Sequence, residues 1–553
     1  MKRWDHEADV VIVGAGGAAL AAAAAALEEG AQVVLLEAAE EAGGTTRGSG
    51  GAFWIPNNSL MRAAGLTDPR DDALRLMARL SYPSIYDPGA PLLGLPQLEH
   101  DLLATYYDSA AGVIDELSRL GAIRAMILPP LGYAASPIAD PDYHAELREN
   151  KAPIGRVLTA ISPPGAMEWP GAFLAGGMID HVRRKGASIL ARHRVTGALT
   201  GRGGEVIGVE AEHDGAARAV RARRGVVFAT GGFAHDPAKV LSFLRGPIFG
   251  SGSAPTCTGA FIDIATRLGA RLGNLANGFY YQVALEELAA NGGAVRRPDA
   301  HVFLPYGDSM ILVNKSGRRF VNEKAMYHVR AQSHFHWSGT EYPHLIQMMI
   351  WDQAVADEPT FFPWRGCVPL PGHPSPLVIR GETLEDLARA IAERLDRLRG
   401  ARMLGGAVGP GVRLAPDFVE ALRATIDRFN FFAETGIDLD FQRGETPIQP
   451  AWQGPSRSSR NRTMHPIAAT GPYHCVLLAP ATLDTCGGPV IDAAARVLRV
   501  DGSPIPGLFG AGNCIASPAG QAYWGAGGTI GPALTYGYLA GRSAAREAEK
   551  HPS

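Results

Sequence analysis

The fold is decided by a short stretch near the N-terminus, Asp9-Val10-Val11-Ile12-Val13-Gly14-Ala15-Gly16-Gly17-Ala18-Ala19. Its β-branched half is typical of a strand buried on both faces, and its second half matches the pattern G-x-G-x-x-A. An alanine-rich helix follows and ends at Gly30, and a second strand, 32–36, stops at Glu37. This order of strand, glycine turn, helix, strand and acid predicts a βαβ unit that binds a dinucleotide.

Each part of this unit has a physical role. Gly14 permits the tight turn, and Gly16 lets the backbone approach a pyrophosphate closely. Ala19 lets the helix pack against the strand, and the positive end of the helix dipole stabilises the phosphate charge. Glu37 is expected to accept hydrogen bonds from the ribose hydroxyls.

Further glycine-rich segments indicate a long, extended cofactor. A loop of small residues, 43–51, directly follows the ribose acid. Two more buried strands end in glycines, one at Ala229-Thr230-Gly231-Gly232 and one at Gly510-Ala511-Gly512-Asn513. The segment Gly525-x-Gly527-x-x-Ile530 lacks the small third residue of a second fingerprint, so NAD(P)H is disfavoured as a hydride donor.

These segments resemble those of the flavoprotein superfamily of fumarate reductases and 3-ketosteroid dehydrogenases, in which they hold FAD. The resemblance implies an α/β fold with a discontinuous, Rossmann-like FAD-binding domain of the glutathione reductase type, residues 1–286 and 478–553. An α+β catalytic cap domain, 287–477, is inserted into it. The residues expected to bind FAD are Gly14, Gly16, Gly17, Ala18, Glu37, Gly44, Thr45, Thr46, Ser49, Gly50, Gly51, Val195, Ala229, Thr230, Gly231, Gly512, Asn513, Gly528, Ile530 and Gly531.

Periodicity predicts a long helix within the cap. Thr383-Leu384-Glu385-Asp386 looks like a capping box, with Asp in place of the usual Glu. Leucine and isoleucine then recur at helical spacing until Gly400, which predicts a scaffold helix ending there.

Two segments distinguish the reductases of this superfamily from its dehydrogenases. Where fumarate reductases present an arginine, in a run such as N-R-L-G-G, this chain reads Gln521-Ala522-Tyr523-Trp524-Gly525-Ala526-Gly527-Gly528. Where they present a histidine before T-M-G-G, it reads Leu483-Asp484-Thr485-Cys486-Gly487-Gly488. Cationic groups for a dicarboxylate are missing from both places, so a fumarate-type ene reductase is disfavoured.

The same segments resemble 3-ketosteroid Δ1-dehydrogenases, whose equivalent run is Y-P-G-P-G. The resemblance implies that Tyr523 and the backbone N–H of Gly527 hold the ketone oxygen. It also implies that Tyr327 removes a proton and that Tyr143 is its hydrogen-bonding partner. The likeness covers nearly the whole chain, through residues 43–46, 54–56, 141–143, 319–323 and 529–533.

This assignment is chemically consistent. A proton next to a ketone is too weakly acidic to remove in a neutral site unless the enolate is stabilised as it forms. A phenol and an amide N–H aimed at the oxygen act as an oxyanion hole, worth about 3–4 kcal/mol per donor. The implied reaction is FAD-dependent 1,2-desaturation of a 3-ketosteroid, in which the C2 proton goes to Tyr327 and the C1 hydride goes to flavin N5.

Two other functions remain open. One is a flavin desaturase of a smaller cyclic ketone, such as 4-oxocyclohexanecarboxylate, and the other is an electron-transfer subunit without its own substrate. A buried Arg or Lys in the cap favours the carboxylate, whereas an all-apolar trough favours a steroid. Loss of the segment 523–527 would indicate the electron-transfer subunit, and this segment is intact.

Composition limits the partners. The 553-residue chain has 52 Lys and Arg against 55 Asp and Glu, a net charge of −3, so nucleic acid is not an expected partner. Five scattered cysteines predict reduced thiols, no metal site and a cytoplasmic protein. The expected partners are a cyclic ketone and an external electron acceptor, either a quinone or a carrier protein. An apolar run within the loop 83–98 could contact a membrane surface, although simple packing is favoured.

Overall fold

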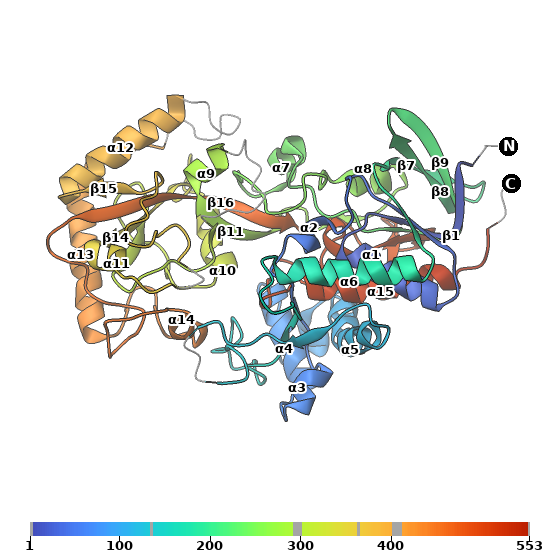
Figure 1. Ribbon diagram of the computed structural model, residues 1–553, viewed down its shortest axis with the longest axis horizontal. Coiled ribbons are helices and arrows are strands. Elements are labelled where there is room, and N and C mark those ends of the chain that lie inside the picture. The colour runs from blue at the N-terminus through green and yellow to red at the C-terminus, as the bar shows by residue number, and fades with distance from the viewer. Residues whose placement is uncertain (1–3, 133–135, 291–300, 362–364, 401–411, 551–553) are drawn as a thin grey trace.

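The structure is a computed structural model that describes residues 4–132, 136–290, 301–361, 365–400 and 412–550 (Figure 1). Its larger sheet contains the strands β1 (His6–Val13), β2 (Val33–Leu36), β6 (Ser188–Leu190), β7 (Arg194–Thr200), β8 (Val206–His213), β9 (Ala216–Phe228), β18 (Arg496–Leu498) and β19 (Pro504–Gly510). The order is β18-β19-β9-β1-β2-β6, and β8 links β7 to β9. The pairs from β19 to β6 are parallel, which is the arrangement of a Rossmann-like domain.

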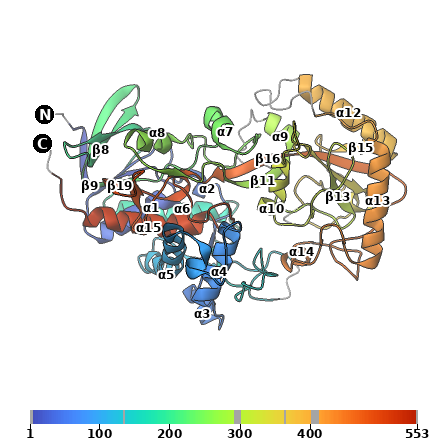
Figure 2. The ribbon, with the colours of Figure 1, turned by 180° about the vertical axis from the view of Figure 1, so that it is seen from behind.

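The dinucleotide fingerprint folds as the sequence predicts. Strand β1 is buried from Val10 to Val13, and α1 (Gly17–Glu28) begins directly after the glycine turn. Both ribbon views place α1 beside α6 (Pro170–Arg184) and α15 (Ile530–Arg546) (Figures 1 and 2). Helix α15 approaches α1 closely, since a Cβ at Gly541 would lie 2.0 Å from the Ala22 carbonyl oxygen.

A smaller sheet and several helices complete the cofactor domain. The sheet has the order β3 (Ala52–Trp54), β5 (Val157–Ala160), β4 (Ala125–Ile127). The remaining elements are α2 (Gly44–Arg47), α3 (Ser59–Ala63), α4 (Arg70–Ser81), η1 (Pro91–Gly94), α5 (Gln97–Arg119), α7 (Pro237–Phe243), α8 (Ala260–Arg267), β10 (Leu272–Gly273), β17 (Gly488–Pro489) and η4 (Gly512–Cys514).

The cap is built on a second, antiparallel sheet. Its strands are β11 (Gly278–Ala284), β12 (His301–Val302), β13 (Met310–Val313), β14 (Gln347–Asp352), β15 (Ile379–Gly381) and β16 (Tyr473–Thr485). Its helices are α9 (Leu285–Ala290), α10 (Tyr327–Ala331), η2 (Gln332–Phe335), α11 (Gln353–Ala356), α12 (Leu384–Gly400), α13 (Phe418–Thr435) and α14 (Ile448–Ala451). The predicted cap helix is confirmed as α12, and the Asp386 N–H donates to Thr383 Oγ1 at its start.

The long strand β16 connects the cap to the cofactor domain, as the orange arrow across Figure 1 shows. Its last residues, up to Thr485, reach the turn after β9, where the Phe233 N–H donates to Thr485 Oγ1. The second sheet also includes β11, which lies before the expected boundary at 286/287. The cap sheet therefore takes in residues from both sides of the expected inserted segment.

The structure also bears on contact with a membrane. Within the described part of the chain, no helix combines the length and the apolar composition needed to cross a bilayer. The apolar run in the loop 83–98 forms η1, and Leu93 and Leu95 pack against the core of the cofactor domain. Packing therefore accounts for these two leucines.

Candidate active site

A cavity of about 730 Å³ lies where the cofactor domain meets the cap. Its walls are formed by glycine-rich turns of the cofactor domain and by aromatic side chains of the cap. The structure places most of the predicted FAD residues on these walls: Gly14, Gly16, Gly17, Ala18, Glu37, Gly44, Thr45, Thr46, Ser49, Gly50, Gly51, Val195, Ala229, Thr230, Gly231, Gly512, Asn513 and Ile530.

The turn after β1 packs so closely against a neighbouring segment that no side chain fits at Gly14. Gly14 has a φ of +105°, and a Cβ there would lie 2.4 Å from the Ala229 carbonyl oxygen. The Gly17 N–H donates to Thr46 Oγ1 at 3.1 Å, which ties the loop 43–51 to the start of α1. A helix N-terminus framed by such a turn is the cradle that a pyrophosphate requires.

Glu37 is held in place at one end of the cavity. Its Oε2 accepts the Ala15 N–H and its Oε1 accepts the Ala39 N–H, both at 2.8 Å. Burial raises the pKa of Glu37, although these backbone donors oppose the effect. The carboxyl group is therefore fixed in the cavity wall, and its contact with the ribose hydroxyls stays a prediction.

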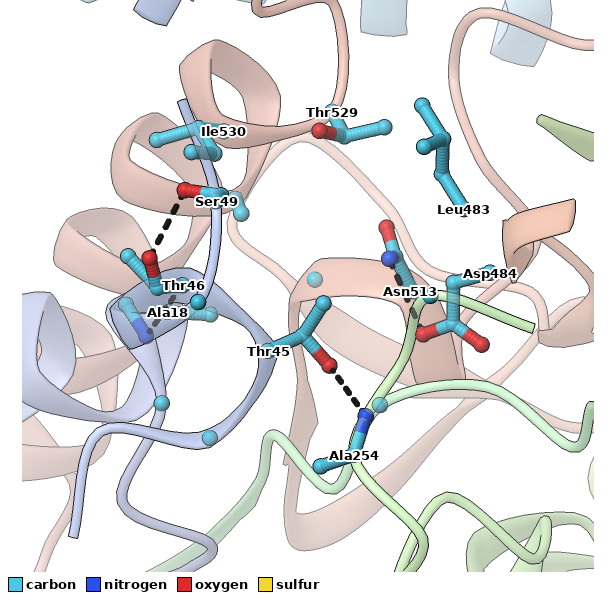
Figure 3. Close-up of a pocket in the computed structure, with 18 of the residues that line it drawn as sticks. Ala18, Thr45, Thr46, Ser49, Ala254, Leu483, Asp484, Asn513, Thr529 and Ile530 are labelled. Atoms are coloured by element: carbon cyan, nitrogen blue, oxygen red, sulfur yellow. Dashed lines mark hydrogen bonds between the residues drawn. The ribbon is translucent and has the colours of Figure 1, made fainter. Parts of the chain in front are cut away.

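Polar groups from distant segments meet along the wall of the cavity (Figure 3). The Ala254 N–H donates to Thr45 Oγ1 at 3.0 Å, and Ser49 Oγ donates to the Thr46 carbonyl at 2.7 Å. Asn513 Nδ2 donates to Asp484 Oδ2 at 3.1 Å. These contacts fix the loop 43–51 against the strand ends that follow it along the cofactor path.

Two glycines of the predicted set, Gly528 and Gly531, do not line the cavity. The Gly528 N–H donates to the Gly525 carbonyl at 2.9 Å. A Cβ at Gly531 would lie 2.4 Å from the Trp54 carbonyl oxygen. Both residues are explained by the close packing of the turn before α15, and cofactor contact is not needed to account for them.

The three predicted tyrosines meet at the other end of the cavity, and each is only 6% exposed. The Tyr143 hydroxyl donates to the Tyr327 hydroxyl at 3.4 Å. The Tyr523 ring lies 5.5 Å from the Tyr327 ring and 6.2 Å from the Tyr143 ring, between centroids. The fold thus brings together residues from a loop of the cofactor domain, from α10 and from the turn before α15.

Gly527 completes this cluster through its backbone. Its N–H donates to the Tyr523 hydroxyl at 3.3 Å, so the two predicted oxygen-binding groups converge. Its φ is +82°, and a Cβ would lie 2.3 Å from the Phe53 backbone. The Gly527 carbonyl accepts the Trp54 N–H at 3.2 Å, which fixes the orientation of the peptide.

Burial raises the pKa of Tyr143 and of Tyr327 well above the ordinary value for tyrosine. It also raises the pKa of Tyr523, while hydrogen bonds from Tyr327 and Gly527 oppose that shift. The three side chains are therefore neutral phenols in the resting cavity. A neutral phenol donates a hydrogen bond, which suits Tyr523 as the group that holds a ketone oxygen.

The wall around the tyrosines is apolar. Of the described residues that line the cavity, Arg194 is the one Lys or Arg, and it lies at the opposite end, next to Glu37. The cavity-lining residues that pack in the same hydrophobic cluster as the tyrosines include Leu131, Phe303, Trp452 and Leu483.

The sequence did not predict the contact that holds part of the cavity wall in place. In this contact, called the Asp140 clasp below, one carboxylate oxygen links Leu131 to Trp452. Asp140 Oδ2 accepts the Leu131 N–H at 2.7 Å and the Trp452 Nε1–H at 2.8 Å. The Trp452 ring lies 5.8 Å from the Tyr143 ring in an edge-on arrangement. Asp140 and Trp452 are 312 positions apart, and neither belongs to a motif that could have linked them.

Comparison with known proteins places the chain in a family. The family model described as an FAD binding domain matches residues 9–530. A 4-oxocyclohexanecarboxylate 2-dehydrogenase of Sinomonas cyclohexanicum is 30% identical over 90% of this chain and 86% of its own length. A 3-oxosteroid 1-dehydrogenase of Mycolicibacterium smegmatis is 28% identical over 89% of both chains.

A solved structure shares the fold. The 3-ketosteroid Δ1-dehydrogenase of Sterolibacterium denitrificans, in complex with 1,4-androstadiene-3,17-dione, superimposes with a TM-score of 0.78. The match covers 98% of this chain and 99% of that chain, at 24% identity. The Gly14 turn, the start of α1 and the fixed Glu37 carboxyl together fit the phosphates and ribose of FAD. The chain belongs to the FAD binding domain family, and it is an FAD-dependent oxidoreductase of the ketosteroid dehydrogenase and fumarate reductase superfamily.

Proposed function

We propose that this protein catalyses the FAD-dependent 1,2-desaturation of a 3-ketosteroid. The observation that carries the proposal is the convergence of the Tyr523 hydroxyl and the Gly527 N–H beside the Tyr143–Tyr327 pair. In this proposal an external acceptor, either a quinone or a carrier protein, takes up the electrons afterwards.

The residues divide the chemistry between them. Tyr523 and Gly527 donate hydrogen bonds to the ketone oxygen and stabilise the negative charge that develops there. Tyr327 removes the C2 proton as its phenolate and becomes a neutral phenol, and Tyr143 donates a hydrogen bond that stabilises the Tyr327 phenolate before the transfer. The buried position of all three excludes competing water. The chemistry that FAD supplies when bound is acceptance of a hydride from the neighbouring carbon, C1.

The apolar wall favours a steroid over the smaller acid. The cap does contain fully buried cations, Lys324, Arg330 and Arg443, but none of them lines the described cavity. The one described Lys or Arg in the lining, Arg194, lies next to Glu37. A carboxylate buried without a cation or several donors is strongly disfavoured. A tetracyclic hydrocarbon instead gains from burial against Leu131, Phe303 and Trp452. The second candidate substrate is 4-oxocyclohexanecarboxylate, because the chain is similar to a dehydrogenase named for this acid.

The test is to add androst-4-ene-3,17-dione to the yellow holoenzyme without oxygen and to follow the flavin absorbance. Rapid bleaching together with a 1,4-dien-3-one product supports the proposal. An unchanged spectrum with this and other 3-ketosteroids rejects the steroid assignment. Bleaching by 4-oxocyclohexanecarboxylate alone would establish the second candidate.

The rate of desaturation is expected to rise with pH. Burial holds the pKa of Tyr327 well above its ordinary value, so the basic form becomes more populated as the pH increases. Single-turnover flavin reduction measured from about pH 6 to about pH 9 should accelerate throughout. A rate that stays constant over this range would exclude Tyr327 as the base that limits the reaction.

Replacing Asp140 by alanine is expected to raise KM for the steroid about tenfold, while kcat changes little. The substitution removes two hydrogen bonds, each worth about 0.5–1.5 kcal/mol, that hold Leu131 and Trp452 in the cavity wall. Asp140→Asn keeps an oxygen acceptor and serves as the matched control. Equal KM values for the alanine variant and the wild type would show that the clasp does not shape the site.

A further inference from the structure

A buried carboxyl group that the proposed mechanism does not use lies in the wall of the cofactor cavity. Asp484 is on β16, where this strand reaches the cofactor domain, and it is 1% exposed. Its side chain lies beside that of Asn513 and across the cavity from Ile530 (Figure 3). The side chain is therefore fixed in the wall of the cavity that is expected to hold the cofactor.

Only neutral groups hold this carboxyl in place. Its Oδ1 accepts the Thr485 N–H at 2.9 Å. Its Oδ2 accepts the Gly232 N–H at 2.9 Å and Asn513 Nδ2–H at 3.1 Å. A Cβ at Gly232 would lie 2.4 Å from Oδ1, so the turn after β9 fits tightly around the acid.

The charge on Asp484 is not balanced by a cation. In the part of the chain that the structure describes, no Lys, Arg or His forms an ion pair with it, and the groups that donate to it, including the Ser253 hydroxyl, are neutral. The titratable groups that face it are the thiols of Cys257 and Cys486, and burial keeps both of them protonated. Burial also raises the pKa of Asp484 to about 6, despite its hydrogen-bond donors. The side chain is therefore neutral in mild acid and negative in mild alkali.

The position of Asp484 along the cavity decides which part of the cofactor it affects. The preceding residue, Leu483, packs against the hydrophobic cluster that contains Tyr143, Tyr327 and Tyr523. A ketone held by these tyrosines has to meet the hydride-accepting ring, so the ring belongs at this end of the cavity. Leu483 thus connects Asp484 directly to the tyrosine cluster, whereas Glu37, the acid expected to bind the ribose, belongs to a different hydrogen-bonded group, with Ala15 and Ala39.

We propose that Asp484 sets the local charge beside the flavin ring and thereby controls the reduction potential of bound FAD. Reduction adds two electrons and at least one proton to the flavin, so a neighbouring carboxylate opposes it. The protonated acid lacks this repulsion. The protein then binds an easily reduced flavin in mild acid and a less easily reduced one in mild alkali, whichever ketone it oxidises.

The experiment compares wild-type and Asp484→Asn holoenzymes by anaerobic titration with redox dyes, at about pH 5 and about pH 8. Asparagine has the same size and no charge. At the higher pH the variant should favour the reduced flavin at least tenfold more than the wild type, which is about 30 mV for a two-electron couple. At the lower pH the two potentials should coincide, because both side chains are neutral.

The control is Asp501→Asn, which removes an exposed carboxylate and should leave the potential unchanged at both pH values. A difference between wild type and Asp484→Asn of the same size at both pH values, or none at all, overturns the proposal. If the variant loses FAD, the wild-type potential decides the question. Compared with that of free FAD titrated in parallel, the wild-type potential should fall more steeply with pH just above about pH 6, because reduction then also adds a proton to Asp484. A pH dependence parallel to that of free FAD overturns the proposal. No ketone is present, so the result is independent of the substrate assignment.

Discussion

Replacing Tyr327 by phenylalanine is expected to lower kcat about 10²- to 10⁴-fold, the range that a positioned general base contributes. The variant keeps the ring, which lies 4.8 Å from the Phe303 ring in an edge-on contact, so the wall of the site is preserved. It loses only the oxygen that receives the proton. Substrate binding and FAD content should therefore remain close to those of the wild type.

The measurement is flavin reduction in a single turnover, with substrate affinity taken from the concentration dependence. Tyr473→Phe is the matched control, because Tyr473 is another buried tyrosine of the cap and its hydroxyl donates to the Ala468 carbonyl, away from the cavity lining. A Tyr327→Phe enzyme that reduces its flavin within a few fold of the wild-type rate would require a different base. Tyr143 would then be the next residue to test.

The parts of the site that could be predicted are those formed by residues close together in the chain. The turn at Gly14 and the acid at Glu37 belong to one βαβ unit, so strand, turn and helix signals suffice to place them. The roles of Tyr523 and Gly527 came from the family resemblance, but the two residues are only four positions apart in one glycine-rich turn. Their convergence follows from a single loop conformation, which Gly527 adopts with a φ of +82°.

Contacts between distant segments could not be worked out from local patterns. Tyr143 and Tyr327 are 184 positions apart, and only the family resemblance linked them. The clasp of Asp140 on Trp452 has no such resemblance behind it, and an aspartate in a proline-rich loop gives no signal of its partner. The strand β11 is buried throughout, so its composition could not show that it pairs with β16 in the cap sheet.

The largest effect on stability is expected at Arg156, which is fully buried and supports both halves of the tyrosine cluster. It donates to both carboxylate oxygens of Asp68 and to Asp142 Oδ2, all at 2.8 Å. Asp142 directly precedes Tyr143. The guanidinium also lies 5.3 Å from the Trp54 ring, and the Trp54 N–H holds the Gly527 carbonyl.

Arg156→Met is expected to lower the free energy of unfolding by about 3–5 kcal/mol, because it leaves two buried carboxylates without their cation. Thermal unfolding of the holoenzyme, followed by flavin release, should occur several degrees below the wild-type temperature. Arg148→Met is the control: its side chain is 77% exposed beside Glu149, and its loss should cost less than about 1 kcal/mol.

The pH dependence of the stability lost in Arg156→Met distinguishes the effect of the Arg156 charge from that of its packing against Trp54. Without Arg156, the buried Asp142 carboxylate is more easily protonated in the folded protein than in the unfolded chain, so folding is favoured as it takes up a proton. The deficit of Arg156→Met should therefore shrink when the pH is lowered from about 7 to about 5. Burial raises the pKa of Asp142 even in the wild type, although the Arg156 guanidinium lowers it. Part of the lost free energy of unfolding should therefore return at mildly acidic pH. A deficit that is constant with pH would mean that Arg156 stabilises the fold through its contact with Trp54, and that the loop before Tyr143 does not depend on its charge.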